Sequence, residues 1–198
     1  MRVVVTRAAG DEVELVARLE EAGHQVVHVP LIAIEPLGDE PVDVGGYEWL
    51  LVTSARGATE LRRRGLVGSP PRVAAIGPAT ARALGGADLV ARVSTQEGLL
   101  AELPRPPGRV LLAAAEGARR LIADELGADV LALYRTHELR PATFPDADVC
   151  VLASASAARA FGALARPIPS VCIGPQTALA AEAAGVEVSA VAATHDVA

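Results

Sequence analysis

The sequence carries the same strand end, turn and helix start twice. IGPATARAL at residues 76–84 is matched by IGPQTALAA at residues 173–181. In each copy an apolar run ends in Gly, where the missing Cβ lets the backbone turn, and Pro follows at a position that suits the first helical turn, where its N–H is not needed. The duplication therefore predicts two copies of one folding unit.

The duplication extends over most of the chain, because three further pairs of segments match. These pairs are YEWLLVTSARGATEL (47–61) with ADVCVLASASAARAF (147–161), RVVVTRAAG (2–10) with RVLLAAAEG (109–117), and STQEGLL (94–100) with ATHDVA (193–198). A shorter strand–helix–strand part and a longer part thus alternate along the chain, in the order short, long, short, long. The matching places Ser54 opposite Ser154 and Thr80 opposite Thr177.

Short apolar segments alternate with helical segments, which is typical of βαβ units and a parallel sheet. The sequence predicts an α/β protein with two similar doubly wound parallel-sheet domains. Periodicity leaves two pairings of the parts open. A tandem pairing would divide the chain near PRPPG (104–108). An interleaved pairing would make the middle an inserted domain, joined by two crossing strands in PLIAIEPL (30–37) and YRTHELRP (134–141).

Composition limits the classes of function. Of 198 residues 51% are hydrophobic, which supports a sizeable core, and the net charge of −6 comes without the clustered basic face of a nucleic-acid binder. No apolar run reaches the roughly 18–20 residues of a membrane span, and MRVVVTRAAGDE turns polar too soon for a signal peptide. Cys150 and Cys172 lie in apolar runs and are expected to be buried, reduced thiols, and no metal-ligand spacing is found.

Hydroxyl residues recur where the predicted strands give way to helices. The positions are Ser54, Thr80, Ser154 and Thr177, with Thr6 and Arg7 after the first strand. Backbone N–H groups and the positive end of the helix dipole bind anions at such turns, and ligands of doubly wound folds lie beyond the carboxyl ends of the strands. We therefore expect both sets to face one cleft that accepts a large ligand with several carboxylates. The alternative for each single hydroxyl is that it caps its helix.

Taken in order, these motifs resemble those of the uroporphyrinogen-III synthase family. The matching segments are VVVTRAAG, VPLIAIEPL, WLLVTSARGA, VAAIGPATARAL, STQEGLLAEL, VLALYRT, VLASASAARAF and CIGPQTALAAEAAGVEV. The resemblance covers nearly the whole chain and implies the interleaved arrangement. Residues 1–34 and 139–198 would form one α/β domain, residues 38–134 an inserted second domain, and residues 35–37 and 135–138 the two linker strands.

The resemblance also implies an enzyme that uses neither a metal nor a cofactor. Its substrate would be hydroxymethylbilane, which it closes with inversion of the last ring through a spiro intermediate, releasing water and uroporphyrinogen III for heme biosynthesis. Tyr134 in VLALYRT would be the catalytic proton donor, and Thr6, Arg7, Ser54, Thr80, Ser154 and Thr177 would bind the substrate. The resemblance further leads us to expect a cytoplasmic monomer in transient contact with the upstream bilane synthase, without nucleic-acid or membrane partners.

Two other functions stay open at this point. One is a non-catalytic, synthase-like module that binds tetrapyrroles or regulates, and the other is a two-lobed small-molecule receptor, which the missing export signal disfavours. Arg56 stands where the family usually has Asn, and the repeat predicts a further helix after ATHDVA. His24 and His28 alternate on a predicted strand and are expected to be surface or core residues rather than catalysts.

Overall fold

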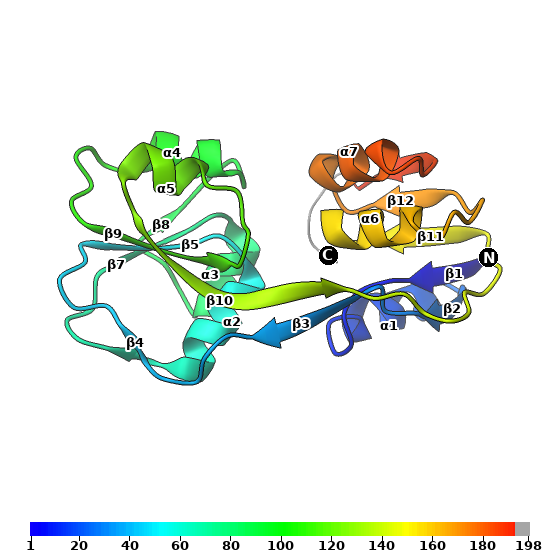
Figure 1. Cartoon of the computed structure of the whole chain (residues 1–198), viewed down its shortest axis with the longest axis horizontal. Helices are drawn as coiled ribbons and strands as arrows, with labels where there is room; N and C mark the ends of the chain where they lie inside the picture. The colour runs from blue at the N-terminus through cyan, green and yellow to red at the C-terminus, as the bar shows by residue number, and fades with distance from the viewer. Residues whose placement is uncertain (193–198) are drawn as a thin grey trace. The chain divides into compact units, whose positions relative to one another are not determined.

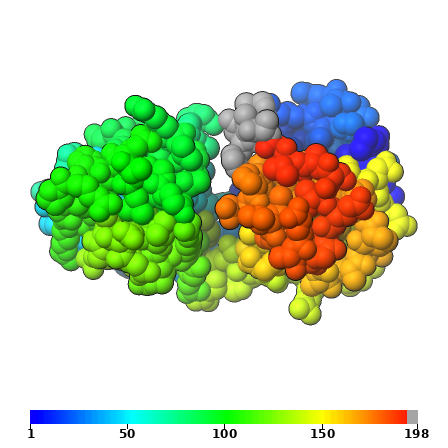
Figure 2. All heavy atoms as spheres, turned by 90° about the horizontal axis from the view of Figure 1, so that it is seen from above, coloured from blue at the N-terminus to red at the C-terminus, as the bar shows by residue number. Residues whose placement is uncertain are grey.

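The chain divides into two compact units in the computed structural model, which describes residues 1–192. Unit 1 comprises Met1–Ile34 together with the segment from Thr136 onward, and unit 2 comprises Glu35–Arg135. In Figure 2 the N-terminal residues, in blue, gather with the yellow-to-red C-terminal residues in one body. Residues 193–198, which the sequence matches with 94–100, and the helix expected after them lie outside the described residues.

Unit 1 is built on a five-stranded parallel sheet of order β13-β12-β11-β1-β2 (Figure 1). Its elements are β1 (Arg2–Val5), α1 (Val13–Glu21), β2 (Gln25–His28), β11 (Val149–Leu152), α6 (Ala155–Gly162), β12 (Ser170–Cys172), α7 (Pro175–Ala183) and β13 (Val188–Val191). Helix α1 packs on one face of the sheet, whereas α6 and α7 pack on the other. The strand order reverses between β1 and β11, which makes their carboxyl ends the switch point where doubly wound folds bind ligands.

Unit 2 contains a six-stranded sheet of order β3-β10-β9-β5-β7-β8 and a small parallel pair, β4-β6. Its elements are β3 (Ile32–Pro36), β4 (Val42–Asp43), β5 (Trp49–Val52), α2 (Ala55–Arg64), β6 (Leu66–Val67), β7 (Arg72–Ala75), α3 (Pro78–Leu84), β8 (Leu89–Val90), α4 (Gln96–Glu102), β9 (Val110–Ala115), α5 (Leu121–Leu126) and β10 (Asp129–Glu138). The strands from β10 to β8 are parallel to their neighbours. The switch point lies between β9 and β5.

The two units repeat one topology. The segment β9-α5-β10 corresponds to β1-α1-β2, and β5-α2-β7-α3-β8 corresponds to β11-α6-β12-α7-β13, so the strands of both sheets follow the same order. The predicted fold class, two doubly wound α/β domains, is confirmed. The PRPPG segment at 104–108 lies inside unit 2, between α4 and β9.

Strands β3 and β10 carry the chain from one unit to the other and are neighbours in the sheet order. The Leu37 N–H donates to the Leu133 carbonyl at 2.8 Å, and the Leu139 N–H donates to the Leu31 carbonyl at 2.8 Å. The linker of the predicted fold class is therefore a hydrogen-bonded pair of strands rather than two unstructured connections.

The apolar runs of the sequence form the cores. Leu51, Val52 and Val5 are fully buried, and burial of such a side chain stabilises a fold by about 1.5–3 kcal/mol. Cys150 and Cys172 are buried, unpaired thiols, and burial raises the pKa of Cys150 well above its ordinary value. Within residues 1–192, none of the helices has the length and apolar character that crossing a membrane requires.

Candidate functional site

Two serines begin helices at the carboxyl ends of equivalent strands. Ser54 follows β5 and accepts a hydrogen bond from the N–H of Gly57 at 2.9 Å, and Ser154 follows β11 and accepts one from the N–H of Ala157 at 3.1 Å. Both serines have extended backbones, as N-cap residues do. Each Ser therefore caps its helix, and both stand beside the switch point of their sheet.

Two threonines lie in the first turn of the helices that follow the Gly-Pro turns. Thr80 in α3 and Thr177 in α7 are the third helical residues, after Pro at the first position, and the caps themselves are Gly77 and Gly174. Thr80 is 3% exposed and Thr177 is 5% exposed. Because glycine has no capping side chain, neither helix has a side-chain cap at this position, and the threonine hydroxyl belongs to the turn with the free N–H groups.

The residues after β1 divide between the interior and the surface of unit 1. Thr6 is fully buried, and its hydroxyl donates to the Val151 carbonyl on β11 at 2.8 Å. This bond ties the two strands of the switch point together. Arg7 is half-buried and lines a cavity of about 390 Å³ together with Val151 and Ile173. The structure thus presents Arg7 at the surface of this turn and uses the Thr6 hydroxyl inside the unit.

A β-bulge sets the direction of Tyr134. Ala132 on β10 lies opposite Ala114 on β9, but Tyr134 lies opposite the next residue, Ala115, so Leu133 is an additional residue. Residues directly opposite share a face of the sheet and successive residues alternate, so the bulge moves Tyr134 to the face opposite that of Ala132. There Tyr134 is 8% exposed. Without the bulge it would point to the face that α4 and α5 cover.

Ser54 and Tyr134 form a hydrogen-bonded pair within unit 2. The Ser54 Oγ lies 3.1 Å from the Tyr134 hydroxyl, and either group can be the donor. A Cβ on Gly57 would lie 3.1 Å from the Ser54 Oγ and 3.6 Å from the Leu133 Cδ1, so glycine leaves the space that this arrangement uses. Unit 1 has Ala157 at the equivalent position. A phenol held by a second hydroxyl at a helix N-terminus can donate a proton and stabilise developing negative charge.

An ion pair holds the backbone around Tyr134. The Arg135 guanidinium donates through Nε and through Nη2, the latter at 2.8 Å, to the two carboxylate oxygens of Glu116, and Glu35 lies 3.8 Å away on the other side. The N–H of Glu116 also donates to the Tyr134 carbonyl at 2.8 Å. The bidentate contact between Arg135 and Glu116 therefore holds the end of β9 against β10 immediately after the bulge, and it fixes the orientation of the two groups as well as their distance.

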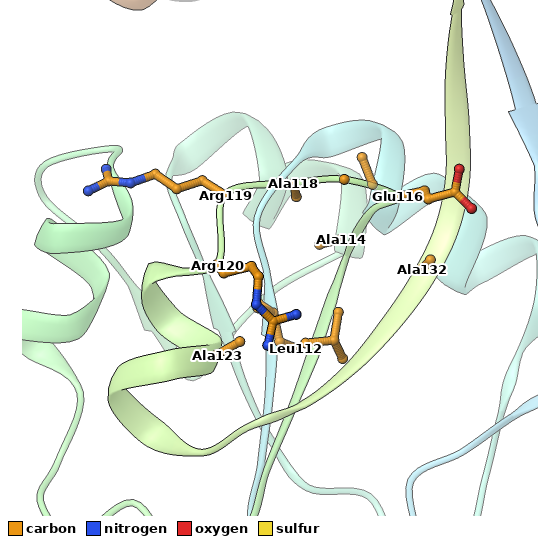
Figure 3. A pocket seen from close by; sticks show the side chains of 11 residues that line it. Leu112, Ala114, Glu116, Ala118, Arg119, Arg120, Ala123 and Ala132 are labelled. Atoms are coloured by element: carbon orange, nitrogen blue, oxygen red, sulfur yellow. The ribbon is translucent and has the colours of Figure 1, made fainter.

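A cavity of about 160 Å³ lies beside Glu116, over the carboxyl end of β9 and the first half of β10 (Figure 3). Its floor is apolar, with Leu112 and Ala132, and Figure 3 shows Glu116 directed toward β10 while Arg119 points the opposite way. Arg119 pairs with Glu97 at 2.5 Å. Since the charged side chains at its rim are paired within unit 2, this cavity is an apolar surface depression rather than an anion-binding site.

No three His, Cys, Asp or Glu side chains gather in a possible metal site anywhere in residues 1–192. Sequence reasoning reached Tyr134 only through the family motif and did not find Gly57, Leu133 or Arg135, which direct and hold it. The one local signal was the Gly at position 57, where the repeat has Ala. His28 is partly buried, and its ring hydrogen-bonds the Arg7 carbonyl.

The fold and these residues define a class of protein: duplicated doubly wound α/β proteins with uncharged hydroxyls at strand ends and a directed tyrosine in one unit. The sequence profile described as uroporphyrinogen-III synthase HemD matches residues 13–198. The chain belongs to this uroporphyrinogen-III synthase family.

Individual relatives agree with this assignment. A uroporphyrinogen-III synthase of Synechococcus elongatus is 27% identical over 166 residues, a match that spans 73% of this chain and 63% of the relative. Among solved structures, a mutant uroporphyrinogen III synthase of Thermus thermophilus has a TM-score of 0.66 and 20% identity, covering 99% of this chain and 94% of that one. The uroporphyrinogen-III synthetase of Helicobacter pylori has a TM-score of 0.64 and 19% identity, covering 100% and 95%. These two structures show that the fold is shared.

Proposed function

We propose that this protein is a uroporphyrinogen-III synthase, which closes hydroxymethylbilane with inversion of its last ring. Membership of the family supports the proposal. The observation that carries it is the contact of 3.1 Å between the hydroxyls of Ser54 and Tyr134, because the bulge of β10 directs Tyr134 toward the start of α2. The reaction needs no nucleophilic side chain. It needs a positioned proton donor and groups that bind carboxylates, and Tyr134 and the hydroxyls at the strand ends can serve as these.

In the proposed mechanism Tyr134 donates its proton to the terminal hydroxyl of the bilane, which leaves as water. The resulting protonated azafulvene is a cationic electrophile, and the last ring attacks it through its substituted α-carbon, forming the spiro intermediate. The bond between the spiro carbon and the bridge to the preceding ring then breaks, and that bridge carbon is attacked by the free α-carbon of the last ring, on the other side of its nitrogen. The final carbon loses a proton, which the Tyr134 oxygen can take back. Ser54 keeps the phenol in place by hydrogen bonding throughout.

The carboxylates of the substrate are assigned to the hydroxyls and to Arg7. Ser154 and Thr177 in unit 1 lie at the starts of α6 and α7, where backbone N–H groups and the helix dipole favour negative charge. Thr80 is the corresponding group in unit 2. Arg7 can fork a carboxylate with two N–H donors. Because the Thr6 hydroxyl is used inside the unit, we assign Thr6 the support of this turn rather than a direct contact.

The isomer ratio of the product tests this function. Freshly generated hydroxymethylbilane closes without help to the type I isomer, so a synthase is recognised by rapid formation of the type III isomer. Type I product alone, at the uncatalysed rate, would refute the enzyme. If the stable tetrapyrrole product nevertheless binds, the protein is instead a non-catalytic module of the same fold.

The role of Tyr134 is tested with the only other tyrosine as a matched control. Tyr134→Phe should lower kcat by about 100-fold or more, the usual effect of a general acid, and leave product binding nearly unchanged. The Tyr47 hydroxyl donates to Asp129 at 2.9 Å and does not belong to the proposed site, so Tyr47→Phe should keep wild-type kcat. Equal kcat in both variants would remove Tyr134 from the proton-donor role.

We further propose that the protein acts as a monomer in the cytoplasm. Two buried, unpaired cysteines suit a reducing compartment. Sedimentation of the purified chain tests the oligomeric state, and a dimer at micromolar concentration would contradict it. Transient contact with the upstream bilane synthase is tested by the yield of type III product when the two enzymes are mixed.

A further inference from the structure

The turn that carries Arg7 is held by a side chain of the neighbouring strand. His28, the last residue of β2, places its Nε2 2.9 Å from the Arg7 carbonyl oxygen, in a partly buried position. A carbonyl oxygen can only accept, so Nε2 is the donor. The contact joins residues 21 positions apart and fixes the peptide group immediately after the Arg7 side chain.

The other nitrogen of His28 faces a carboxylate. Nδ1 lies 3.5 Å from Glu12 Oε1, and the two side chains are 23% and 19% exposed. When Nδ1 carries a second proton, the ring is an imidazolium and this contact becomes an ion pair. The second oxygen of Glu12, Oε2, is buried and has no hydrogen-bond partner among residues 1–192. The pKa of Glu12 is lowered, chiefly by a hydrogen bond from its own backbone N–H and then by the charges of His28 and Arg7.

Glu12 thus lies near both His28 and Arg7, and the geometry pairs it with His28. The charge of Arg7 acts on Glu12, but within the described part of the chain the carboxylate is within ion-pair distance of His28 only. Arg7 lines the cavity beside β11 and β12 instead. Among residues 1–192 no carboxylate lies within ion-pair distance of the Arg7 guanidinium, which can therefore fork a carboxylate of a ligand.

We propose that His28 and Glu12 are positioning residues for substrate binding. His28 clamps the Arg7 carbonyl and occupies the Glu12 carboxylate, so the Arg7 guanidinium stays available for a carboxylate of the substrate. This role rests on the proposed function, because it requires a polycarboxylate ligand. The clamp on the turn does not depend on that function and can be measured separately.

Three variants of His28 separate its two nitrogens. His28→Gln places an amide N–H near the position of Nε2 and keeps the bond to Arg7, His28→Asn places its amide near Nδ1 and loses that bond, and His28→Leu loses both. We expect KM for hydroxymethylbilane to rise about tenfold in His28→Asn, the effect of about one hydrogen bond, with kcat within about twofold of wild type. KM should rise further in His28→Leu, because that variant also frees the Glu12 carboxylate. His28→Gln should restore most of the affinity.

Two outcomes would overturn the proposal. One is an unchanged KM in His28→Leu, and the other is an equal KM in the Gln and Asn variants. Amide hydrogen exchange of residues 7–12 in the free protein is the second measurement, because it needs no substrate. It should be faster in the Leu and Asn variants and close to wild type in His28→Gln. Uniform exchange in all variants refutes the clamp. Responsive exchange together with a wild type that forms no type III product supports the clamp and refutes the proposed function.

Arg7 and Glu12 are linked to His28 by double variants. In an Arg7→Gln background, His28→Leu should raise KM no further, because the group that it positions is gone. In a His28→Leu background, Glu12→Gln should lower KM again, because the carboxylate that competes for Arg7 is neutral. Additive effects in both backgrounds would show that His28 acts elsewhere.

Discussion

Removal of the Ser54 hydroxyl should cost unit 2 two interactions that can be measured apart. The hydroxyl accepts the N–H of Gly57 at 2.9 Å, which caps α2, and it contacts the Tyr134 hydroxyl at 3.1 Å. Loss of a Ser cap costs about 1 kcal/mol, and loss of one hydrogen bond about 1 kcal/mol more. We therefore expect Ser54→Ala to destabilise unit 2 by about 2 kcal/mol.

A double-mutant cycle isolates the contact between the two hydroxyls. Tyr134→Phe removes that contact but leaves the cap, so it should cost about 1 kcal/mol. The double variant loses the cap and the same single contact, and should therefore cost about 2 kcal/mol rather than the roughly 3 kcal/mol expected from addition. The coupling energy between Ser54 and Tyr134 is then about 1 kcal/mol.

Urea unfolding followed by tryptophan fluorescence is the assay. Trp49 is the only tryptophan of the chain, is 3% exposed and lies on β5, the strand that leads to Ser54, so it reports on unit 2. With a slope of about 2 kcal/mol per M urea, a loss of about 2 kcal/mol moves the midpoint by about 1 M. Ser154→Ala is the matched control. It removes the equivalent cap in unit 1, where the sequence has no tyrosine, and should cost about 1 kcal/mol by circular dichroism.

The result that would refute this reasoning is additivity. If the single variants sum to the double variant within about 0.3 kcal/mol, Ser54 and Tyr134 do not interact in solution. Equal destabilisation by Ser54→Ala and Ser154→Ala would likewise reduce Ser54 to a simple helix cap.

Three further predictions concern other parts of the structure. Gly57→Ala should change stability by less than about 1 kcal/mol but lower kcat several-fold, since its methyl group would crowd the capping hydroxyl, and unchanged kcat would show that the space is not needed. Cys150 and Cys172 should resist thiol reagents at pH 8 until the chain is unfolded, because burial raises the pKa of both thiols; rapid labelling of the native protein would contradict their burial. The hydrogen bond from the Tyr47 hydroxyl lowers the pKa of Asp129. The Asp129 carboxylate therefore stabilises the fold at pH values above its ordinary pKa, and this stabilisation is lost as the pH falls through the lowered pKa. Asp129→Asn should be less stable than wild type at pH 7 and as stable as wild type in strong acid.

The local features of the site could be predicted because they depend on residues close in sequence. Gly followed by Pro after an apolar run favours a turn and a helix start, which located Thr80 and Thr177 at the third position of α3 and α7. The same logic located Ser54 and Ser154 at helix starts. Both serines cap their helices, and their contact with a ligand stays a prediction that capping does not exclude, because a cap uses one lone pair of the hydroxyl.

Other features of the site could not be predicted from the sequence, because they depend on groups that are far apart in the chain. The Thr6 hydroxyl is used because it donates to the Val151 carbonyl of β11. His28 contacts the Arg7 carbonyl because the turn after β1 folds back toward β2. Neither partner can be read from the alternation of apolar and polar residues. The assignment of segments to the two units was open for the same reason, since both pairings of the repeated parts satisfy the same periodicity.

The sequence by itself determined the duplication, the alternation of strands and helices and the hydroxyls at strand ends, because these follow from local backbone chemistry and hydrophobic period. The tertiary structure alone decided which way the catalytic candidate points. In a regular strand Tyr134 would share a face with Ala132, and only the register of β10 against β9, with Leu133 as the additional residue, turns it toward Ser54. Register is a property of two strands together, so one strand's sequence does not contain it.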